Sequence, residues 1–316
     1  MPCETNLASD CCRDQDLGSE DDVQGDAAGT PTQAERRQVN REQMRRVFSP
    51  GERIALRWMV KLGLRQWFYA WYRATRTASP GIGQFRDIHL GQRCFILGCG
   101  PSLKQHDPSW LVDEYTFGMN GIFLLRDWLG FEPTYYAVED NLFHEDRFHD
   151  IKDFVRASAC FYPLQFECHG FNRSNHYYYR GIYDFDEVDD PDWPNFSDDA
   201  TRLLFSGGTA TYICLQLAYF MGFEEVVLLG MDHSYTVPKG IIVRGDEWTS
   251  TRADPNHFHP DYLGPGYRCR SPRTDRMEKA YLEARRVFER DGRRILNASV
   301  GGKLEVFERV DYESLF

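Results

Sequence analysis

Two short glycine-containing turns carry residues that suit the binding of a phosphate group. The first turn, Gly98-Cys-Gly-Pro-Ser-Leu-Lys104, follows an apolar run, and the second, Ser206-Gly-Gly-Thr209, precedes a helical pattern. Glycine lets backbone N–H groups approach an anion, and a helix N-terminus adds a favourable dipole. Neither turn is a Walker A loop or a complete dinucleotide-binding loop. Two such turns favour a nucleotide-activated sugar or another phosphorylated donor over a single phosphate.

The segment 254–261, Asp-Pro-Asn-His-Phe-His-Pro-Asp, concentrates side chains that can move a proton or bind a metal. We interpret His257 as a general base, because a neutral imidazole titrates near physiological pH. A histidine that is hydrogen-bonded within a loop is one alternative. A metal site is another, although the usual third ligand is not evident. Its ligands would be His257, His259, Asp254 and Asp261.

Two adjacent carboxylates, Glu139 and Asp140, lie at the end of another apolar run. Carboxylates of this kind can bind Mg²⁺ together with the phosphates of a nucleotide. A single acidic pair at a turn is also commonly solvated, or caps a helix. The sequence leaves both interpretations open.

The elements that must position these residues alternate between strands and helices from residue 92 onward. Apolar runs predict strands over 92–98, 114–121, 133–141, 159–164, 225–233 and 294–299. Helical patterns cover 121–129, 144–155, 209–221 and 275–291. Ser206 is the expected cap of the third helix, and Asp275 with Glu278 has the spacing of a capping box at the fourth. The alternation predicts an α/β fold, a doubly wound, mostly parallel Rossmann-like sheet with helices on both faces.

In a sheet of this type, ligands bind beyond the carboxyl ends of the strands. Those ends hold 98–104, Asn120, Glu139 with Asp140, 206–209 and 232–235. Two long polar segments interrupt the alternation. We expect 165–200 to be an irregular, lid-like insertion and 235–273 to be a second irregular segment.

Composition excludes several classes of protein. The chain has 316 residues, a net charge of −11 and 42% hydrophobic residues, which is a soluble, core-forming composition. An acidic chain argues against a nucleic-acid partner, because phosphate contact needs clustered Lys and Arg. No apolar run approaches a membrane span, and no secretory signal is visible. The nine cysteines form no CxxC pair, which indicates reduced thiols in a cytoplasmic protein.

Charge divides the chain into three predicted parts. Residues 1–33 hold eight acids and one arginine, which predicts a disordered acidic tail. Residues 34–80 form a basic, aromatic helical extension, and 81–316 form the catalytic domain. Within the extension, 52–76 interleaves tryptophans with cations and resembles an interfacial helix on anionic lipid. The alternatives are packing on the acidic domain and a contact between copies in a homo-oligomer.

Four motifs resemble the bacterial sialyltransferases that have a single Rossmann-type nucleotide-binding domain. The resemblance extends to their relatives that share a domain with the motility accessory factors, and it covers about residues 92–300. The motifs are FILGCGPSLK (95–104), TFGMN (116–120), LFSGGTATYICLQLAYFMGFEEVVLLGMDHSY (204–235) and DPNHFHPDYLG (254–264). Their order in the chain matches the family. Two departures are Cys99, where the sialyltransferases have Asn, and Tyr235, which stands one residue later than their tyrosine.

The resemblance implies a set of donor-binding residues. They are Gly98, Gly100, Pro101, Ser102, Asn120, Ser206, Gly207, Gly208, Thr209 and Asp232. It also implies that Tyr235 stabilises the leaving phosphate and that His257 is the base.

The implied activity is transfer of an acidic, sialic-acid-like sugar from a CMP-activated donor to a glycan or envelope acceptor. The implied mechanism is an inverting displacement that needs no metal and no cofactor. The implied place is the cytoplasmic face of the membrane. A related branch, the archaeal hydroxymethylpterin diphosphokinase, is similar in the first turn and implies ATP and Mg²⁺ at Glu139 and Asp140. A non-catalytic, membrane-docked binding protein is the third alternative. An enzyme should bring His257 and Tyr235 to one pocket, whereas a binding protein need not.

Overall fold

The computed structural model describes residues 81–164, 166, 173–182, 194–237, 240–244 and 247–316, with isolated positions between 51 and 67. The predicted tail, 1–33, and nearly all of the predicted extension, 34–80, lie outside the described residues. The interfacial helix predicted over 52–76 therefore stays a prediction.

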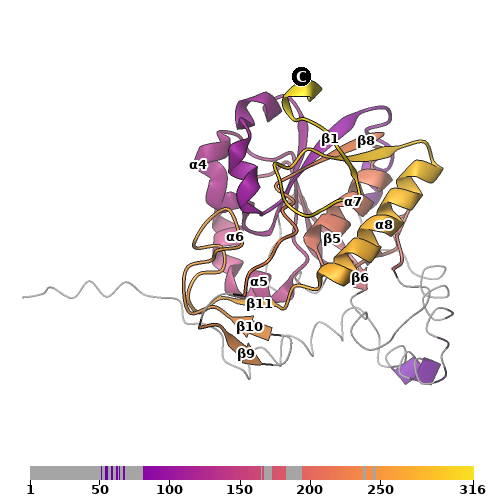
Figure 1. The fold of residues 1–316 in the computed structure, drawn as a ribbon. Coiled ribbons are helices and arrows are strands. Elements are labelled where there is room, and N and C mark those ends of the chain that lie inside the picture. Colours follow the sequence, from indigo (N-terminus) through magenta and orange to yellow (C-terminus); the bar gives the residue numbers. More distant parts are fainter. Residues whose placement is uncertain are drawn as a thin grey trace, which may run out of the picture. The chain divides into compact units, whose positions relative to one another are not determined.

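Eight strands form one parallel sheet at the centre of the described residues (Figure 1). Their order is β13-β12-β8-β1-β2-β3-β4-β5, and every neighbouring pair is parallel. The strands are β1 (Arg93–Leu97), β2 (Tyr115–Met119), β3 (Tyr135–Ala137), β4 (Ala159–Pro163), β5 (His176–Tyr179), β8 (Glu225–Leu229), β12 (Arg294–Asn297) and β13 (Glu308–Arg309). The predicted α/β fold with a mostly parallel sheet is confirmed, and all six predicted strands are present.

Both faces of the sheet are buried at its centre, because successive side chains of the inner strands enter different hydrophobic clusters. In β1, Ile96 packs into the cluster that includes α7 (Ala210–Phe220) and α8 (Thr274–Arg290). Its neighbours Phe95 and Leu97 pack into the opposite cluster. The continuous apolar runs in the sequence have this physical cause, since a strand covered on both faces needs no polar side.

The remaining helical elements are short. On the face opposite α7 lie η4 (Asn120–Leu125), α4 (Arg126–Leu129), α5 (Asn141–Asp146) and α6 (Phe148–Phe154). Further 3₁₀ turns are η1 (Ile82–Phe85), η2 (Pro101–Gln105), η3 (Pro108–Leu111) and η6 (Glu313–Leu315). Helices thus cover both faces, as the doubly wound fold requires.

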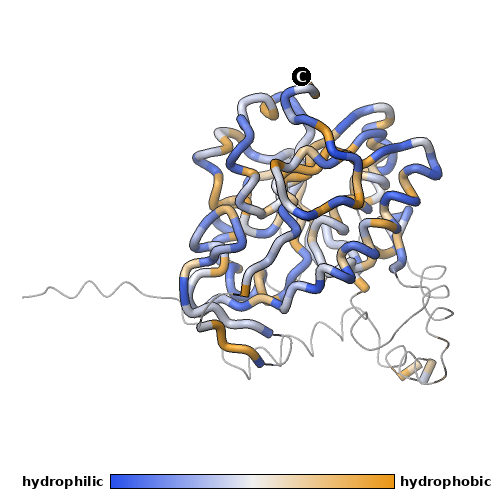
Figure 2. The backbone as a smooth tube through the Cα atoms, in the orientation of Figure 1, coloured by the Kyte–Doolittle hydropathy of each residue, from blue (hydrophilic) through white to orange (hydrophobic). Residues whose placement is uncertain are grey.

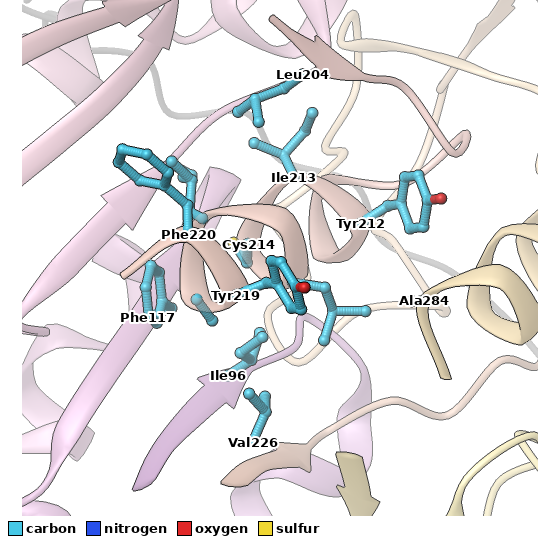
Figure 3. Close-up of a cluster of buried hydrophobic side chains, with 14 of the residues drawn as sticks. Ile96, Phe117, Leu204, Tyr212, Ile213, Cys214, Tyr219, Phe220, Val226 and Ala284 are labelled. Carbon is cyan, nitrogen blue, oxygen red and sulfur yellow. The ribbon is translucent and has the colours of Figure 1, made fainter. Parts of the chain in front are cut away.

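Helix α7 lies at the centre of the sheet face that it shares with α8, and every one of its residues is buried. Figure 3 shows Ile96 of β1 and Val226 of β8 below the helix, and Leu204 beside Ile213 above it. Leu204 belongs to β7 (Leu204–Phe205), which pairs with β6 (Gly181–Ile182). Helix α8 packs against α7 and is amphipathic, so hydropathy alternates along it (Figure 2).

The two polar segments contain strands that the sequence analysis missed. Residues 176–179, predicted as part of an irregular insertion, form the edge strand β5. Tyr178 and Tyr179 of this strand enter opposite clusters, and tyrosine favours such half-buried strands. Segment 235–273 contributes an antiparallel sheet of β9 (Ile242–Arg244), β10 (Glu247–Thr249) and β11 (Arg268–Arg270).

Three predicted helix starts are wrong. Thr209, not Ser206, caps α7, and its side chain accepts a hydrogen bond from the Thr211 N–H. No capping box starts α8, because the helix begins one residue before Asp275 and its N-cap is Arg273. The helix predicted over 144–155 begins at residue 141, where Asp140 caps it, and it is interrupted at Arg147.

None of the five described cysteines forms a disulfide. Cys94, Cys160 and Cys214 are buried in the core, while Cys99 and Cys269 are partly exposed. Among the described helices, none combines the length and apolar character needed to cross a bilayer.

Candidate functional site

A cavity of about 250 Å³ lies where the order of the strands reverses. From β1 the chain adds β2 to β5 on one side, whereas β8, β12 and β13 lie on the other. This switch point, at the carboxyl ends of β1 and β8, is the usual ligand site of such sheets. Residues that follow β1, β2, β3 and β8 line the cavity, together with the start of α7 and the loop 254–263.

The structure brings eight of the twelve predicted site residues to this one cavity. They are Gly100, Asn120, Ser206, Gly208, Thr209, Asp232, Tyr235 and His257. The other four, Gly98, Pro101, Ser102 and Gly207, are not among the lining residues. Because the eight come from five separate stretches of chain, the fold gathers distant motifs as the sequence analysis expects.

The backbone of the first glycine turn is hydrogen-bonded to the end of β8. The Gly98 N–H donates to the Leu229 carbonyl at 2.7 Å, and the Gly100 N–H donates to the Gly230 carbonyl at 3.0 Å. Ser102 is buried and donates to Oδ2 of Asp232 through its hydroxyl at 2.9 Å and its backbone N–H at 3.2 Å. These three residues therefore hold the turn and Asp232 in place, and their donors are already engaged.

The second glycine turn opens into the cavity at the N-terminus of α7. Gly208 has φ of +76°, a left-handed conformation that glycine adopts without strain. Its N–H donates to the Ser206 hydroxyl at 3.2 Å, and that hydroxyl in turn donates to Oε1 of Glu139. Thr209, Ala210 and the turn before them line the cavity, so the positive end of the helix dipole faces it.

Asn120 lies at the end of β2, in the left-handed region with φ of +42°. Its carbonyl accepts a hydrogen bond from the Tyr136 hydroxyl at 2.6 Å, which holds the residue at the cavity wall. Its side-chain Oδ1 is buried and makes no hydrogen bond to any described residue. A buried acceptor without a partner is costly, so this atom is suited to a donor group on a ligand.

His257 is held in a fixed orientation at the cavity wall. Its Nδ1 lies 2.6 Å from Oδ2 of Asp254, and its ring stacks on Tyr262 with 3.9 Å between ring centroids. The Asp254 side chain is 2% exposed, and its Oδ1 accepts a hydrogen bond from the Asn256 N–H at 2.8 Å. A carboxylate on Nδ1 keeps the proton there, which leaves Nε2 as the basic nitrogen.

Glu139 and Asp140 both line the cavity, and burial changes their acidity. Burial raises the pKa of Glu139 to about 7, although the hydrogen bond from Ser206 opposes the shift. Burial also raises the pKa of Asp140, whose Oδ1 accepts from the Leu142 N–H as the cap of α5.

Side chains of the described residues do not form a complete metal site by themselves, whereas Mg²⁺ bound with a nucleotide needs only one or two carboxylates. No three His, Cys, Asp or Glu side chains in the described ranges gather as ligands would. Glu139 is engaged with Ser206 and Asp140 with its helix cap, and burial disfavours the ionised form of both. His259 pairs with Asp261 and is not among the lining residues, so the alternative metal site of 254–261 does not assemble.

Sequence reasoning missed Arg270, the one Lys or Arg among the described residues that line the cavity. Arg270 ends β11. Its positive charge partly offsets the rise that burial causes in the pKa of Glu139 and of Asp140. Its neighbour on the strand, Arg268, is 1% exposed and pairs with Asp146 at 2.5 Å and Glu145 at 3.0 Å. This buried group fastens β11 to α5, and no motif in the sequence indicates it.

His233 is a second histidine at the cavity that the sequence analysis did not single out. It has φ of +48°, and its Nε2 lies 3.3 Å from Oε1 of Glu278 on α8. Burial lowers its pKa, which favours the neutral ring. The positive φ of a non-glycine residue could not be foreseen from the run Gly-Met-Asp-His-Ser.

The fold and its cavity define a doubly wound, Rossmann-like α/β protein with a site at the switch point of the sheet. The chain belongs to the family described as 6-hydroxymethylpterin diphosphokinase MptE-like, which matches residues 72–238. This confirms the superfamily expected from the motifs. The matched range contains both glycine turns and ends before the loop that holds His257.

The chain was also compared with curated protein sequences and with solved structures. No curated protein sequence matches the chain. Among solved structures, it is similar to the MAf glycosyltransferase from Magnetospirillum magneticum AMB-1, with 15% sequence identity and a TM-score of 0.45. The similarity covers 74% of this chain and 38% of that one.

Proposed function

We propose that the protein is a glycosyltransferase. It transfers an acidic, sialic-acid-like sugar from a CMP-activated donor to a glycan or envelope acceptor. The donor binds at the carboxyl ends of β1, β2 and β8, with its phosphate at the start of α7. The acceptor enters from the side of the loop 254–263.

One observation carries this proposal: His257 and Tyr235 line the same cavity as the N-terminus of α7. The Nδ1 of this histidine is fixed by a buried carboxylate, which leaves Nε2 to act as a base. Such a pair is the usual arrangement of a general base. It supports an enzyme over the non-catalytic alternative.

The proposed reaction is a single inverting displacement. Nε2 of His257 takes the proton of the acceptor hydroxyl as that oxygen attacks the anomeric carbon. The bond between this carbon and the donor phosphate oxygen breaks, and CMP leaves with the electron pair. The positive end of the α7 dipole and the Tyr235 hydroxyl stabilise the departing phosphate.

Charge in the cavity favours a monophosphate donor over a nucleoside triphosphate. Arg270 is the one Lys or Arg on the described lining, whereas Glu139, Asp140, Asp232 and Asp254 all lie on it. A triphosphate carries about three more charges than the single charge of a sugar-linked phosphate, and it would normally need Mg²⁺. ATP with Mg²⁺ is still the competing ligand in a test, because the family is described by a diphosphokinase.

Thermal shift separates these ligands. We expect CMP to stabilise the protein, by about 2.7 kcal/mol at 100 times its Kd, and ATP with Mg²⁺ to have little effect. Stabilisation by ATP with Mg²⁺ alone would favour the diphosphokinase. With a CMP-activated donor, His257→Ala should lose 10²–10⁴ of the turnover, a range typical of a lost general base, while its melting temperature is retained.

We also infer that the enzyme works at the cytoplasmic face of the membrane through residues 52–76. Trp58, Trp67 and Trp71 stand among six Lys or Arg in that segment. Each such cation contributes on the order of 1 kcal/mol to binding an anionic surface, and salt weakens it. Flotation with anionic vesicles should fail at high salt, and it should fail when the three tryptophans are replaced by serine. Flotation that is equal for both proteins would contradict this location.

A further inference from the structure

The hydroxyl of Ser206 has a single hydrogen, and the protonation state of Glu139 determines the direction of that hydrogen. A serine hydroxyl can donate one hydrogen bond and accept two. In the structure it donates to Oε1 of Glu139 and accepts from the Gly208 N–H. With Glu139 ionised, Ser206 therefore has no hydrogen left for a ligand and presents only a lone pair to the cavity.

Protonation of Glu139 reverses this arrangement. A neutral carboxyl group has an O–H, which can donate to Oγ of Ser206. Ser206 then accepts from both Glu139 and the Gly208 N–H, and its own hydrogen turns toward the cavity. The same proton removes a negative charge beside the N-terminus of α7, where the proposed donor phosphate binds.

We propose that Glu139 and Ser206 form a proton-dependent phosphate subsite, in which binding of the donor phosphate takes up one proton from solvent at Glu139. The proton stays on the carboxyl group while the ligand is bound and returns to solvent when the ligand leaves. This inference rests on the proposed function, because it needs a phosphate at the start of α7.

The groups around Glu139 leave it as the carboxyl group that titrates near neutral pH. Burial raises the pKa of the Cys214 thiol on α7 and of the Tyr281 hydroxyl on α8, so both are neutral there. The charged neighbours are Asp140 at the end of the same strand and Arg270 on β11, and they act in opposite directions. The pKa of Glu139, about 7, lies close to neutral pH.

The ligand used to count the protons must keep a constant charge over the pH range of the experiment. CMP has a second phosphate ionisation near pH 6, whereas its methyl phosphodiester carries one charge throughout, as the sugar-linked phosphate of the donor does. Calorimetric titration of this ester in two buffers of different ionisation enthalpy counts the protons taken up. Near pH 7.5 we expect uptake of a substantial fraction of a proton, and an affinity that falls by on the order of tenfold or more from pH 6 to 8.5.

Four variants of the full chain test whether the proton is taken up by Glu139. Glu139→Gln has an uncharged amide that can donate to Ser206 and does not titrate, so the uptake and the pH dependence should vanish and the variant should bind more tightly than the native protein at pH 8.5. Asp140→Asn is the matched carboxylate control and His257→Gln the histidine control, and both should keep the uptake. Ser206→Ala should bind about tenfold more weakly at pH 6, where its hydrogen bond is lost.

The outcomes separate this inference from the proposed function. Binding of the CMP ester with no uptake, or with an uptake that Glu139→Gln retains, overturns the subsite alone. If the methyl ester of AMP binds and that of CMP does not, the proposed donor is wrong, and the same variants test the subsite with AMP. Binding of neither ester overturns both proposals.

Discussion

Oδ2 of Asp232 occupies the space that a side chain on Gly100 would need. A Cβ atom at Gly100 would lie 1.8 Å from this oxygen and 2.7 Å from the Gly230 carbonyl oxygen. Asp232 cannot move aside freely, because Ser102 holds the same Oδ2 by two hydrogen bonds. The glycine of the first turn therefore lets the ends of β1 and β8 meet, as well as opening the turn to the cavity.

Gly100→Ala should destabilise the protein by about 3 kcal/mol, the upper end of what overpacking costs. Gly83→Ala is the matched control, because its Cβ would make an ordinary contact with Thr201 at 3.7 Å. It should change stability by less than about 0.5 kcal/mol. Urea unfolding of the two variants measures the difference, and equal midpoints would contradict the argument.

Arg268 should be among the most sensitive positions outside the cavity. Its guanidinium and backbone N–H both bond Asp146, whose side chain is 1% exposed. Arg268→Met leaves that carboxylate buried without its partner, which typically costs 3–5 kcal/mol. The double variant with Asp146→Asn should recover part of the loss, because the uncompensated charge is gone. Additive losses in denaturant unfolding would mean that the pair does not interact.

The sequence predicts the sheet well because its strands are covered on both faces. Continuous apolar runs such as 93–97 and 225–229 leave few alternatives to buried strands. The edge strand β5 escapes this reasoning, since its residues are mostly histidine and tyrosine and its surroundings are polar. The capping box fails for a different reason: α8 begins at Thr274, so Asp275 already lies inside the helix, and Glu278 lies 3.3 Å from Nε2 of His233.

The contacts of the candidate site also differ in how far the sequence can predict them. Pairs within one motif, such as Asp254 with His257, can be read from spacing. Glu139 and Ser206 are 67 residues apart and meet only because two strand ends share one edge of the sheet. Arg270 carries no motif at all, and its place at the cavity depends on Arg268 and the buried carboxylates of α5.

Glu139→Gln should stabilise the protein above pH 7 and not below pH 4.5. The pKa of Glu139 is about 7 in the folded protein and 4.5 when exposed, so between these values the folded state binds more protons. Its ionisation therefore costs stability as pH rises, about 3 kcal/mol in full above pH 7. Unfolding at pH 5 and pH 8.5 measures the change, with the exposed Glu308→Gln as control. A gain that is equal at both pH values would show that Glu139 is not a buried acid.

Asp254→Asn should impair turnover more than binding. Both oxygens of Asp254 accept hydrogen bonds, one from the Asn256 N–H and one from Nδ1 of His257. An asparagine has one accepting oxygen, so its NH₂ must face either the loop or the ring. If it faces the ring, Nδ1 becomes the acceptor and the proton moves to Nε2, where a base must have none.

We expect kcat of Asp254→Asn to fall on the order of 10²-fold with a CMP-activated donor, while the Kd for CMP changes little. Asp261→Asn is the control, because that carboxylate is 69% exposed and is not among the residues that line the cavity. Its turnover should match the native protein. An unchanged kcat in a folded Asp254→Asn protein would show that the ring of His257 needs no carboxylate, and would remove the main reason to regard it as the base.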